Sequence, residues 1–243
     1  MIESSAVGAV TTIELVRPEK RNALNEQMVQ ALSVAFTEAV ASGARAIVLT
    51  GRGEVFSAGA DLSGPVYEHG FIEQLVALVE QIETTPVPVI AALNGAALGA
   101  GLQLAMAADL RVMDPAALAG IPAAKIGVGL DEWTIRRLVS LVGGGQARGM
   151  LIGCDPLSAD RAHTLGFANR IGDLAEAQHW AATIAGFAPL TLQHYKLVLT
   201  GDGARDQPPA ERDQAMRAAW LSEDLQEARA ARTEKRPPKF AGR

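Results

Sequence analysis

The stretch best suited to chemistry is residues 94–109, which read NGAALGAGLQLAMAAD. Gly95, Gly99 and Gly101 allow the backbone to bend sharply, and the apolar run that follows predicts a helix beginning at these glycines. The first amide N–H groups of a helix have no partner within it, and they lie at its partially positive end. This stretch could therefore hold a carbonyl oxygen on which negative charge develops.

The remaining polar residues give no pattern of a metal or nucleophile site. The four histidines, His69, His163, His179 and His194, lack the i, i+4 spacing of metal ligands, and no Ser-His-Asp arrangement can be placed. We expect no metal, and we expect each histidine to be a surface residue or a satisfied helix residue. Cys154 is the one cysteine, so no disulfide can form within the chain, and a reducing compartment is expected.

The elements that must position the 94–109 stretch alternate between strand and helix over the first 145 residues. Strands are expected at 7–16, 46–50, 87–93 and 110–113, and helices at 26–40, around 71–82 and at 132–142. A second glycine-bearing loop, FSAGADLSG, occupies residues 56–64. From Gln146 onward the pattern is helical throughout, with a last helix from about Pro209 to Arg232 and a basic tail. This order predicts an α/β fold with a helical C-terminal part.

Composition limits the classes of partner. Hydrophobic residues make up 49% of the 243 residues and charged residues 20%, as in a globular protein that can bury a sizeable core. The net charge of −5 excludes a general basic surface for nucleic acid. No run of about 18 apolar residues indicates a membrane span, and the start of the chain lacks a signal-peptide pattern, so we expect a cytoplasmic protein.

Four motifs in order resemble the crotonase superfamily, the enoyl-CoA hydratases and isomerases, across nearly the whole chain. They are RPEKRNALN, FSAGADLS, LNGAALGAGLQLAMAADLRV and LSADRAHTLGFANRIG. The resemblance implies a spiral of β-β-α turns over residues 1–190. It also implies a C-terminal α-helical trimerisation region, residues 191–243, that forms a homotrimer or a dimer of trimers.

The resemblance also implies a site for a coenzyme A thioester, with no tightly bound cofactor. Two backbone N–H groups would hold the thioester carbonyl, and by position these are Ala58 and Ala100. The residues expected near the adenine and phosphates of coenzyme A are Arg21, Ala23, Ala60, Asp61 and Leu62. Lys239 and Phe240 resemble the family's basic-aromatic C-terminal end, which can reach the coenzyme A of a neighbouring subunit. For Arg21, a solvated side chain near a helix start is the alternative.

The chain departs from the family pattern at both positions where hydratases carry a glutamate. Gln103 stands at the first and Ala123 at the second, and neither side chain can transfer a proton at neutral pH. A positioned general acid or base contributes roughly 10²–10⁴ in rate, so the loss argues against efficient hydration. Gln103 can still hydrogen-bond a water molecule or a carbonyl group.

One carboxylate could replace the glutamates. Asp131 lies where isomerase and dehalogenase members of the superfamily place a catalytic aspartate, but it could equally be the N-cap of the helix that begins at Glu132. Glu132 and Glu73 are further candidates, with Glu73 expected on the solvated face of its helix.

Gln103, Ala123, GLDEWTIRRL and the ending EKRPPKF give a closer resemblance within the superfamily. They look like the mycobacterial-type hydratase-like proteins that lack both glutamates and bind fatty acyl-CoA for mycolic-acid lipid synthesis. The first hypothesis is thus an acyl-CoA-binding protein with little or no hydratase activity, with lipid-synthesis enzymes as partners. The second is an active enoyl-CoA hydratase or isomerase that uses Asp131. The third is a scaffold that binds partners through its helical C-terminal third.

Overall fold

The structure is a computed structural model, and it describes residues 1–63, 70–201, 217 and 220–239. The chain forms two compact units, one of residues 1–120 with 157–201 and the other of residues 121–156 with 202–243. These units do not follow the boundary expected at residue 190, because the helix after that point stays with the first unit.

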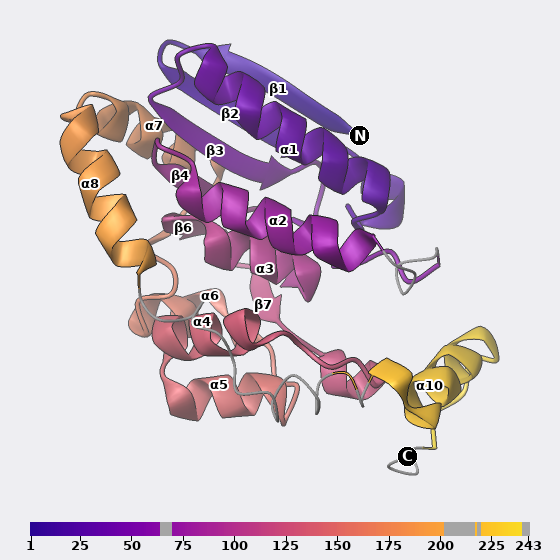
Figure 1. Ribbon diagram of the computed structural model, residues 1–243. Coiled ribbons are helices and arrows are strands. Elements are labelled where there is room, and N and C mark those ends of the chain that lie inside the picture. Colours follow the sequence, from indigo (N-terminus) through magenta and orange to yellow (C-terminus); the bar gives the residue numbers. More distant parts are fainter. Residues whose placement is uncertain (64–69, 202–216, 218–219, 240–243) are drawn as a thin grey trace. The chain divides into compact units, whose positions relative to one another are not determined.

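A six-stranded sheet forms the centre of the first unit (Figure 1). The strands, in spatial order, are β1 (Ile2–Val7), β2 (Val10–Leu15), β3 (Ala46–Gly51), β4 (Val89–Leu93), β6 (Leu110–Met113) and β9 (Arg170–Ile171). All neighbouring strands pair in parallel except β1, which is antiparallel to β2. Every residue of β3 and β4 is buried, as expected for parallel strands covered on both faces.

The expected single strand at 7–16 was wrong at its start. Val7 and Val10 instead face each other across a tight hairpin, and Gly8 in the turn has φ 59°. A left-handed residue at this point suits glycine, and it ends one strand and begins the next. The strand at residues 2–7 was not predicted because it is an edge strand and largely exposed, so its sequence carries no alternating apolar pattern.

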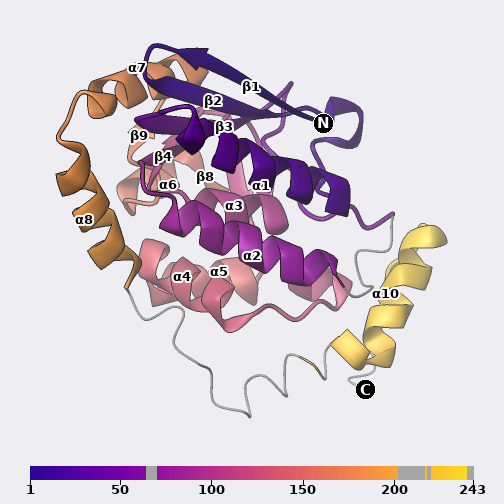
Figure 2. The same ribbon diagram turned by 45° about the horizontal axis from the view of Figure 1, so that its top comes forward.

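Helices cover the two faces of the sheet. The helices α1 (Glu26–Ala41) and α2 (Phe71–Thr84) run side by side over one face, and α7 (Leu174–Ala185) covers the other (Figures 1 and 2). Ala177 and Ala181 of α7 pack in one buried cluster with Val48 and Ile90 of the sheet. The small alanine side chains let this helix approach the strands closely, which closes the core on that side.

A smaller sheet positions the helix predicted from residues 94–109. Its strands are β5 (Ala97–Leu98), β7 (Leu118–Gly120) and β8 (Leu157–Ser158), and α3 (Ala100–Ala107) begins two residues after β5. The 3-10 turn η1 (Pro18–Lys20) and the helix α6 (Ala159–Thr164) complete this part of the unit. The expectation of helix alone after Gln146 was wrong, because the two-residue strands β8 and β9 pair with distant partners and are too short to show a period.

The helix α8 (Pro189–Thr200) is held to the first unit by a buried lysine. Within α8, all of whose residues are described, only Lys196 is buried. Its ammonium group donates to Ile82 O at 3.1 Å, to Val87 O at 3.3 Å and to Asp109 Oδ2 at 2.6 Å. These bonds tie α8 to the end of α2 and to the central sheet, which explains why the helix belongs to this unit.

The second unit is helical where it is described. It contains η2 (Ala123–Ile126), α4 (Glu132–Val142), α5 (Gly144–Leu151) and α10 (Glu223–Thr233). The indole N–H of Trp220 donates to Gly129 O at 2.8 Å, which joins the C-terminal segment to the loop before α4. Much of the helix expected from Pro209 lies outside the described residues. No helix of the described chain is long and apolar enough to cross a membrane.

Candidate functional site

Backbone hydrogen bonds bring the two glycine-bearing loops together. Ser57 N–H donates to Ala96 O at 3.1 Å, and Leu98 N–H donates to Ser57 O at 2.9 Å. The hydroxyl group of Ser57, which is fully buried, donates to Asn22 O at 2.8 Å and so joins the RPEKRN loop to the other two. Three of the four sequence motifs therefore meet in the first unit.

The amide of Ala58 is not available to a ligand, so the prediction for this residue was wrong. Ala58 N–H donates to Arg21 O at 2.9 Å and serves to hold the two loops together. Arg21 has φ 52° and an exposed side chain, as the alternative of a solvated arginine near a helix start expects.

The amide of Ala60, two residues later, faces the other way. Leu24 N–H donates to Gly59 O at 2.7 Å, and Asp61 N–H donates to Leu24 O at 2.8 Å. Because the peptide bond is trans, its C=O and N–H groups point in opposite directions. With Gly59 O directed at Leu24, Ala60 N–H points away from it, and among the described residues it has no acceptor.

The N-terminus of α3 lies against this same peptide. A methyl group built on Gly59, which has φ 95°, would lie 3.5 Å from Ala100 N and only 2.8 Å from Leu98 O. Ala100 N–H also has no acceptor in the described part of the chain, as expected for the first turn of a helix. Glycine at 59 therefore permits two amides that have no acceptor among the described residues, those of Ala60 and Ala100, to lie on neighbouring segments.

Gln103 occupies a distinctive position on α3. Seven of the eight residues of this helix are buried, and Gln103 is the partly exposed one. Its N–H donates to Gly99 O at 3.0 Å, so the residue is held one turn after the amide of Ala100. The side chain at this position is therefore the one that α3 can present to a ligand at its N-terminal end.

Asp61 is locked by polar contacts beside Ala60. Arg17 Nη1 donates to Asp61 Oδ2 at 2.7 Å, and the N–H and hydroxyl groups of Ser63 donate to Asp61 Oδ1 at 3.0 Å and 2.5 Å. Burial alone would raise the pKa of Asp61, but the hydrogen bonds from Ser63 and Arg17 outweigh it and lower the pKa to about 2. Asp61 is thus a carboxylate at neutral pH, directed toward Arg17 and Ser63.

Sequence reasoning missed Arg17 and Asn22 as residues that build the site. Asn22 is fully buried with φ 52°, its side chain donates to Arg52 O at 3.0 Å and Val55 O at 2.7 Å, and its Oδ1 accepts Arg17 N–H at 2.9 Å. An asparagine tolerates the left-handed conformation better than most residues. The RPEKRN motif was the available signal, but it does not show which polar groups face inward. Ala23 is buried next to Asn22, and Leu62 is partly exposed.

In the second unit, Asp131 is the N-cap of α4. Its Oδ1 accepts Thr134 N–H at 2.9 Å and its Oδ2 accepts the Thr134 hydroxyl at 2.6 Å, which confirms the capping interpretation. Ala123 begins η2 and is partly exposed. Of the other carboxylates, Glu132 contacts Arg136 at 3.4 Å, and Glu73, in the first unit, accepts Gly70 N–H at the exposed start of α2.

The C-terminal basic segment is tied to α10 through one carboxylate. Glu227 accepts two hydrogen bonds from Arg236 and one from Lys239 N–H at 2.8 Å. The guanidinium group of Arg236 and then Lys239 N–H lower the pKa of Glu227 to about 2. Lys239 is exposed, while Phe240 lies outside the described residues, so its predicted role is untested.

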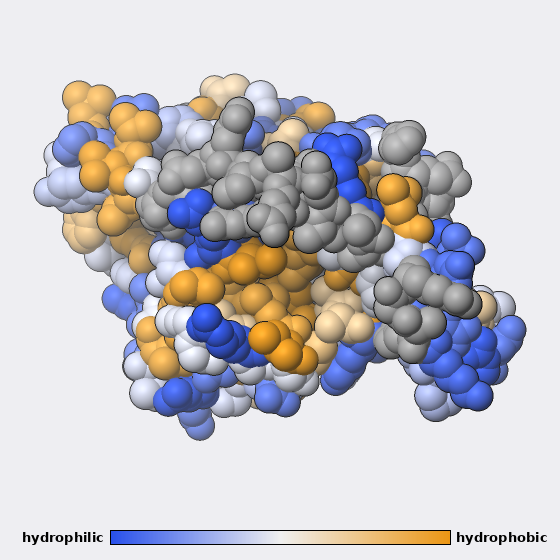
Figure 3. Space-filling model, turned by 60° about the horizontal axis from the view of Figure 1, so that its bottom comes forward, coloured by the Kyte–Doolittle hydropathy of each residue, from blue (hydrophilic) through white to orange (hydrophobic). Residues whose placement is uncertain are grey.

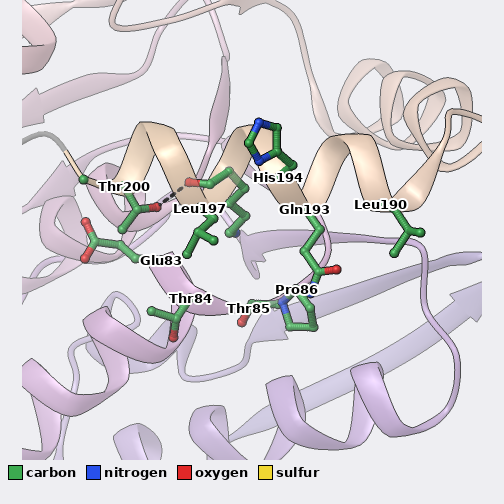
Figure 4. Close-up of a pocket in the computed structure, with 11 residues that line it drawn as sticks. Glu83, Thr84, Thr85, Pro86, Leu190, Gln193, His194, Leu197 and Thr200 are labelled. Atoms are coloured by element: carbon green, nitrogen blue, oxygen red, sulfur yellow. Dashed lines mark hydrogen bonds between the residues drawn. The ribbon is translucent and has the colours of Figure 1, made fainter.

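A pocket of about 440 Å³ lies elsewhere in the first unit, between the end of α2 and α8 (Figure 4). Its wall combines Thr85 and Pro86 with Leu190, His194 and Leu197. None of the predicted site residues lines it. The Lys196 ammonium in its wall already has three acceptors, so it is not a free charge for a ligand.

The strand order and the paired glycine loops define an α/β protein of the crotonase fold. The solved structure of a methylmalonyl-CoA decarboxylase superposes with a TM-score of 0.90 and 25% identity, covering 100% of this chain and 98% of that one. An enoyl-CoA hydratase structure from Geobacillus kaustophilus gives a TM-score of 0.77 and 35% identity, with 100% and 98% covered.

The particular family follows from the sequence comparisons. The model of the family described as Enoyl-CoA hydratase/isomerase matches residues 5–243, and the chain belongs to that family. "Probable enoyl-CoA hydratase echA6" of Mycobacterium tuberculosis is 52% identical over 242 residues, with 100% of both chains covered. The predicted crotonase fold and family are thereby confirmed.

Proposed function

We propose that this protein binds fatty acyl-CoA through its thioester carbonyl and hydrates enoyl-CoA poorly. One observation carries the proposal: the amides of Ala60 and Ala100, which have no acceptor in the described part of the chain, lie on adjoining segments, and α3 carries Gln103 one turn later. Family membership supports a coenzyme A thioester as the ligand.

The two amides supply electrostatic stabilisation. A thioester oxygen that accepts both N–H groups gains negative charge, and the helix N-terminus at Ala100 favours that charge further. Removal of one such donor from an enzyme costs about 10²–10³ in rate, so these amides would both bind the thioester and activate it. Ala60 thus takes the role expected of Ala58, whose amide donates to Arg21 O.

The two positions expected to transfer protons carry side chains that cannot do so. Gln103 and Ala123 stand where the family pattern has its two glutamates, and a carboxamide and a methyl group have no titratable proton near neutral pH. Gln103 can donate or accept a hydrogen bond but cannot act as a general base. The site therefore suits holding an acyl-CoA better than adding water to it.

For the rest of the ligand, we propose that Arg21, Ala23 and Leu62 contact the adenine and phosphate groups. Lys239 and Phe240 would reach the coenzyme A of a neighbouring subunit, as the family resemblance implies. Asp61 is better placed to hold Arg17 than to meet an anionic ligand, since its carboxylate is ionised. The resemblance to mycobacterial hydratase-like proteins supports a role in fatty-acid metabolism, with mycolic-acid synthesis as the specific pathway and its enzymes as partners.

Steady-state hydration of short and long trans-2-enoyl-CoA tests the proposal. We expect a rate at least about 10²-fold below that of glutamate-bearing family members. The variant Gln103→Glu with Ala123→Glu is expected to gain hydration, with each single variant as its control. Turnover of the unmodified protein equal to that of glutamate-bearing hydratases would refute weak hydration, whichever way the double variant behaves.

The alternative is an active hydratase or isomerase with Asp131 as acid and base. Both carboxylate oxygens of Asp131 already accept hydrogen bonds from Thr134, so the observed geometry favours the structural role. An isomerase activity that disappears in Asp131→Asn would favour this alternative instead.

A further inference from the structure

The direction of Ala60 N–H depends on a single peptide group that glycine makes easy to rotate. Gly59 has φ 95°, a conformation that side-chain-bearing residues rarely adopt, and glycine populates many alternatives at little cost. If the Gly59–Ala60 peptide turned over, its C=O would leave Leu24 N–H and Ala60 N–H would point toward Leu24. The orientation of this peptide group therefore depends on contacts that keep the segment of Ala60 aligned with that of Leu24.

The side chain of Arg17 contacts both of these segments. One guanidinium nitrogen, Nη1, donates to Ala23 O at 2.9 Å and to Asp61 Oδ2 at 2.7 Å. Leu24 and Ala60 form an isolated parallel β-bridge. Ala23 precedes Leu24 and Asp61 follows Ala60, so this nitrogen links the two segments beside the β-bridge. The side chains of Arg17 and Asp61 are only 16% and 11% exposed, so solvent screens the pair weakly.

Two further contacts keep this link in place. Arg17 N–H donates to Asn22 Oδ1, which fixes the start of the loop, and Ser63 donates twice to the second oxygen of Asp61. The Asp61 carboxylate therefore cannot turn toward a new partner without losing several hydrogen bonds. None of these polar groups belongs to α3. Their hydrogen bonds therefore position the amide of Ala60 and not that of Ala100.

We propose that Arg17 is a positioning residue, which acts through Asp61 to keep the Ala60 amide aimed at the thioester oxygen. The proposal rests on the function proposed above. Arg17 does not itself touch the ligand, and its removal lets the Gly59–Ala60 peptide sample both orientations. The bound carbonyl group then keeps one constant donor, Ala100, and loses part of the other.

The carbonyl stretch of a bound thioester tests this directly. An acyl-CoA labelled with ¹³C at the thioester carbonyl is bound at saturation to the wild type, Arg17→Met, Arg17→Lys and Asp61→Asn, and infrared difference spectra are recorded. The control is Arg170→Met, which removes an ion pair with Glu176 of 2.6 Å on the far strand of the sheet. Circular dichroism and thermal unfolding confirm that each variant is folded.

In the wild type and Arg170→Met, the band is expected to shift to lower wavenumber than in free acyl-CoA. In Arg17→Met and Asp61→Asn the shift is expected to fall to about half or less, with Arg17→Lys between. A full shift in folded Arg17→Met or in Asp61→Asn would overturn the positioning role alone. No shift in the wild type would overturn the proposed thioester grip, and the positioning role with it.

Discussion

The Arg17–Asp61 ion pair makes the unfolding free energy of the first unit depend on pH over a defined acidic range. The pKa of Asp61 in the folded protein is about 2, below its ordinary value of 3.8. A carboxyl group with a lowered pKa stabilises the fold above its ordinary pKa, and the stabilisation is lost as the pH falls through the folded value.

We therefore expect wild type to lose about 2 kcal/mol of unfolding free energy between pH 5 and pH 2 that Asp61→Asn does not lose. Urea unfolding at both pH values measures the difference. Asp160→Asn, which removes an exposed carboxylate from α6, is the control. Equal acid sensitivity in wild type and Asp61→Asn would show that the ion pair contributes little to the folded state.

The sequence was enough to predict which loops form the site, but not which backbone amides in those loops are available to a ligand. FSAGADL and ALGAGLQ are adjacent, as the resemblance implied, and Ala100 begins α3 as expected. Which of Ala58 and Ala60 is unengaged could not be deduced, because it depends on pairing with Arg21 and Leu24, more than thirty residues earlier. No local pattern reports such a contact.

Elements with a local signal were predicted well, and those without one were missed. The helices α1 and α4 begin where expected because Asn25 and Asp131 cap them, each accepting the N–H three residues ahead. The strands β1, β8 and β9 were not predicted, because an exposed edge strand and two-residue strands carry no period. Their existence depends on partners supplied by the rest of the sheet.

Close packing of α3 against the FSAGADL loop leads to a prediction for Gly101. A methyl group there would lie 2.6 Å from Ser57 Cβ and 2.8 Å from Ser57 O. Both distances are too short, so α3 or the loop that carries Ser57 would have to shift. We expect Gly101→Ala to lower the unfolding free energy by about 2 kcal/mol and to weaken acyl-CoA binding.

Gly145→Ala is the matched control, since Gly145 lies in α5 with no atom within 4 Å of an added methyl group. Alanine is the better helix former, so that variant is expected to gain up to about 1 kcal/mol. Chemical unfolding and calorimetric titration measure both effects. Gly101→Ala as stable as the wild type would mean that α3 does not depend on this contact.

Asp131 gives a second prediction at the level of an element. Since it caps α4, Asp131→Ala is expected to cost about 1 kcal/mol of stability, whereas Asp131→Asn keeps an acceptor and costs much less. Thermal unfolding of both variants measures the cap. Equal losses in the two variants would indicate that the charge of Asp131, and not its capping hydrogen bond, stabilises the second unit.

At the scale of the whole molecule, α8 carries apolar side chains that stay exposed in one chain. Leu190 and Leu197, which line the pocket beside α2, are 78% and 74% exposed, and Leu199, on another side of the helix, is 72% exposed. Figure 3 shows hydrophobic side chains among hydrophilic ones on the side where α8 lies in Figure 1. An apolar patch of this kind commonly marks a protein interface.

We expect the protein to self-associate in solution as a trimer or a dimer of trimers, as the family resemblance implies. Light scattering coupled to size-exclusion chromatography measures the mass of the assembly. Leu197→Glu with Leu199→Glu is expected to weaken it, and Lys125→Glu at an exposed site of η2 is the control. If the protein stays a monomer even at a concentration about 100 times that used in the binding assays, the expectation is contradicted.

The central claim is that the protein grips the thioester carbonyl with the amides of Ala60 and Ala100. The most direct measurement is calorimetric titration of the wild type with a saturated acyl-CoA and with its thioether analogue, in which CH₂ replaces C=O. Both ligands bury the same acyl chain and the same nucleotide, so they differ in the two hydrogen bonds alone. Two hydrogen bonds from amide groups to the carbonyl predict that the thioester binds about 10-fold tighter or more, and equal affinity for the two ligands would contradict the account.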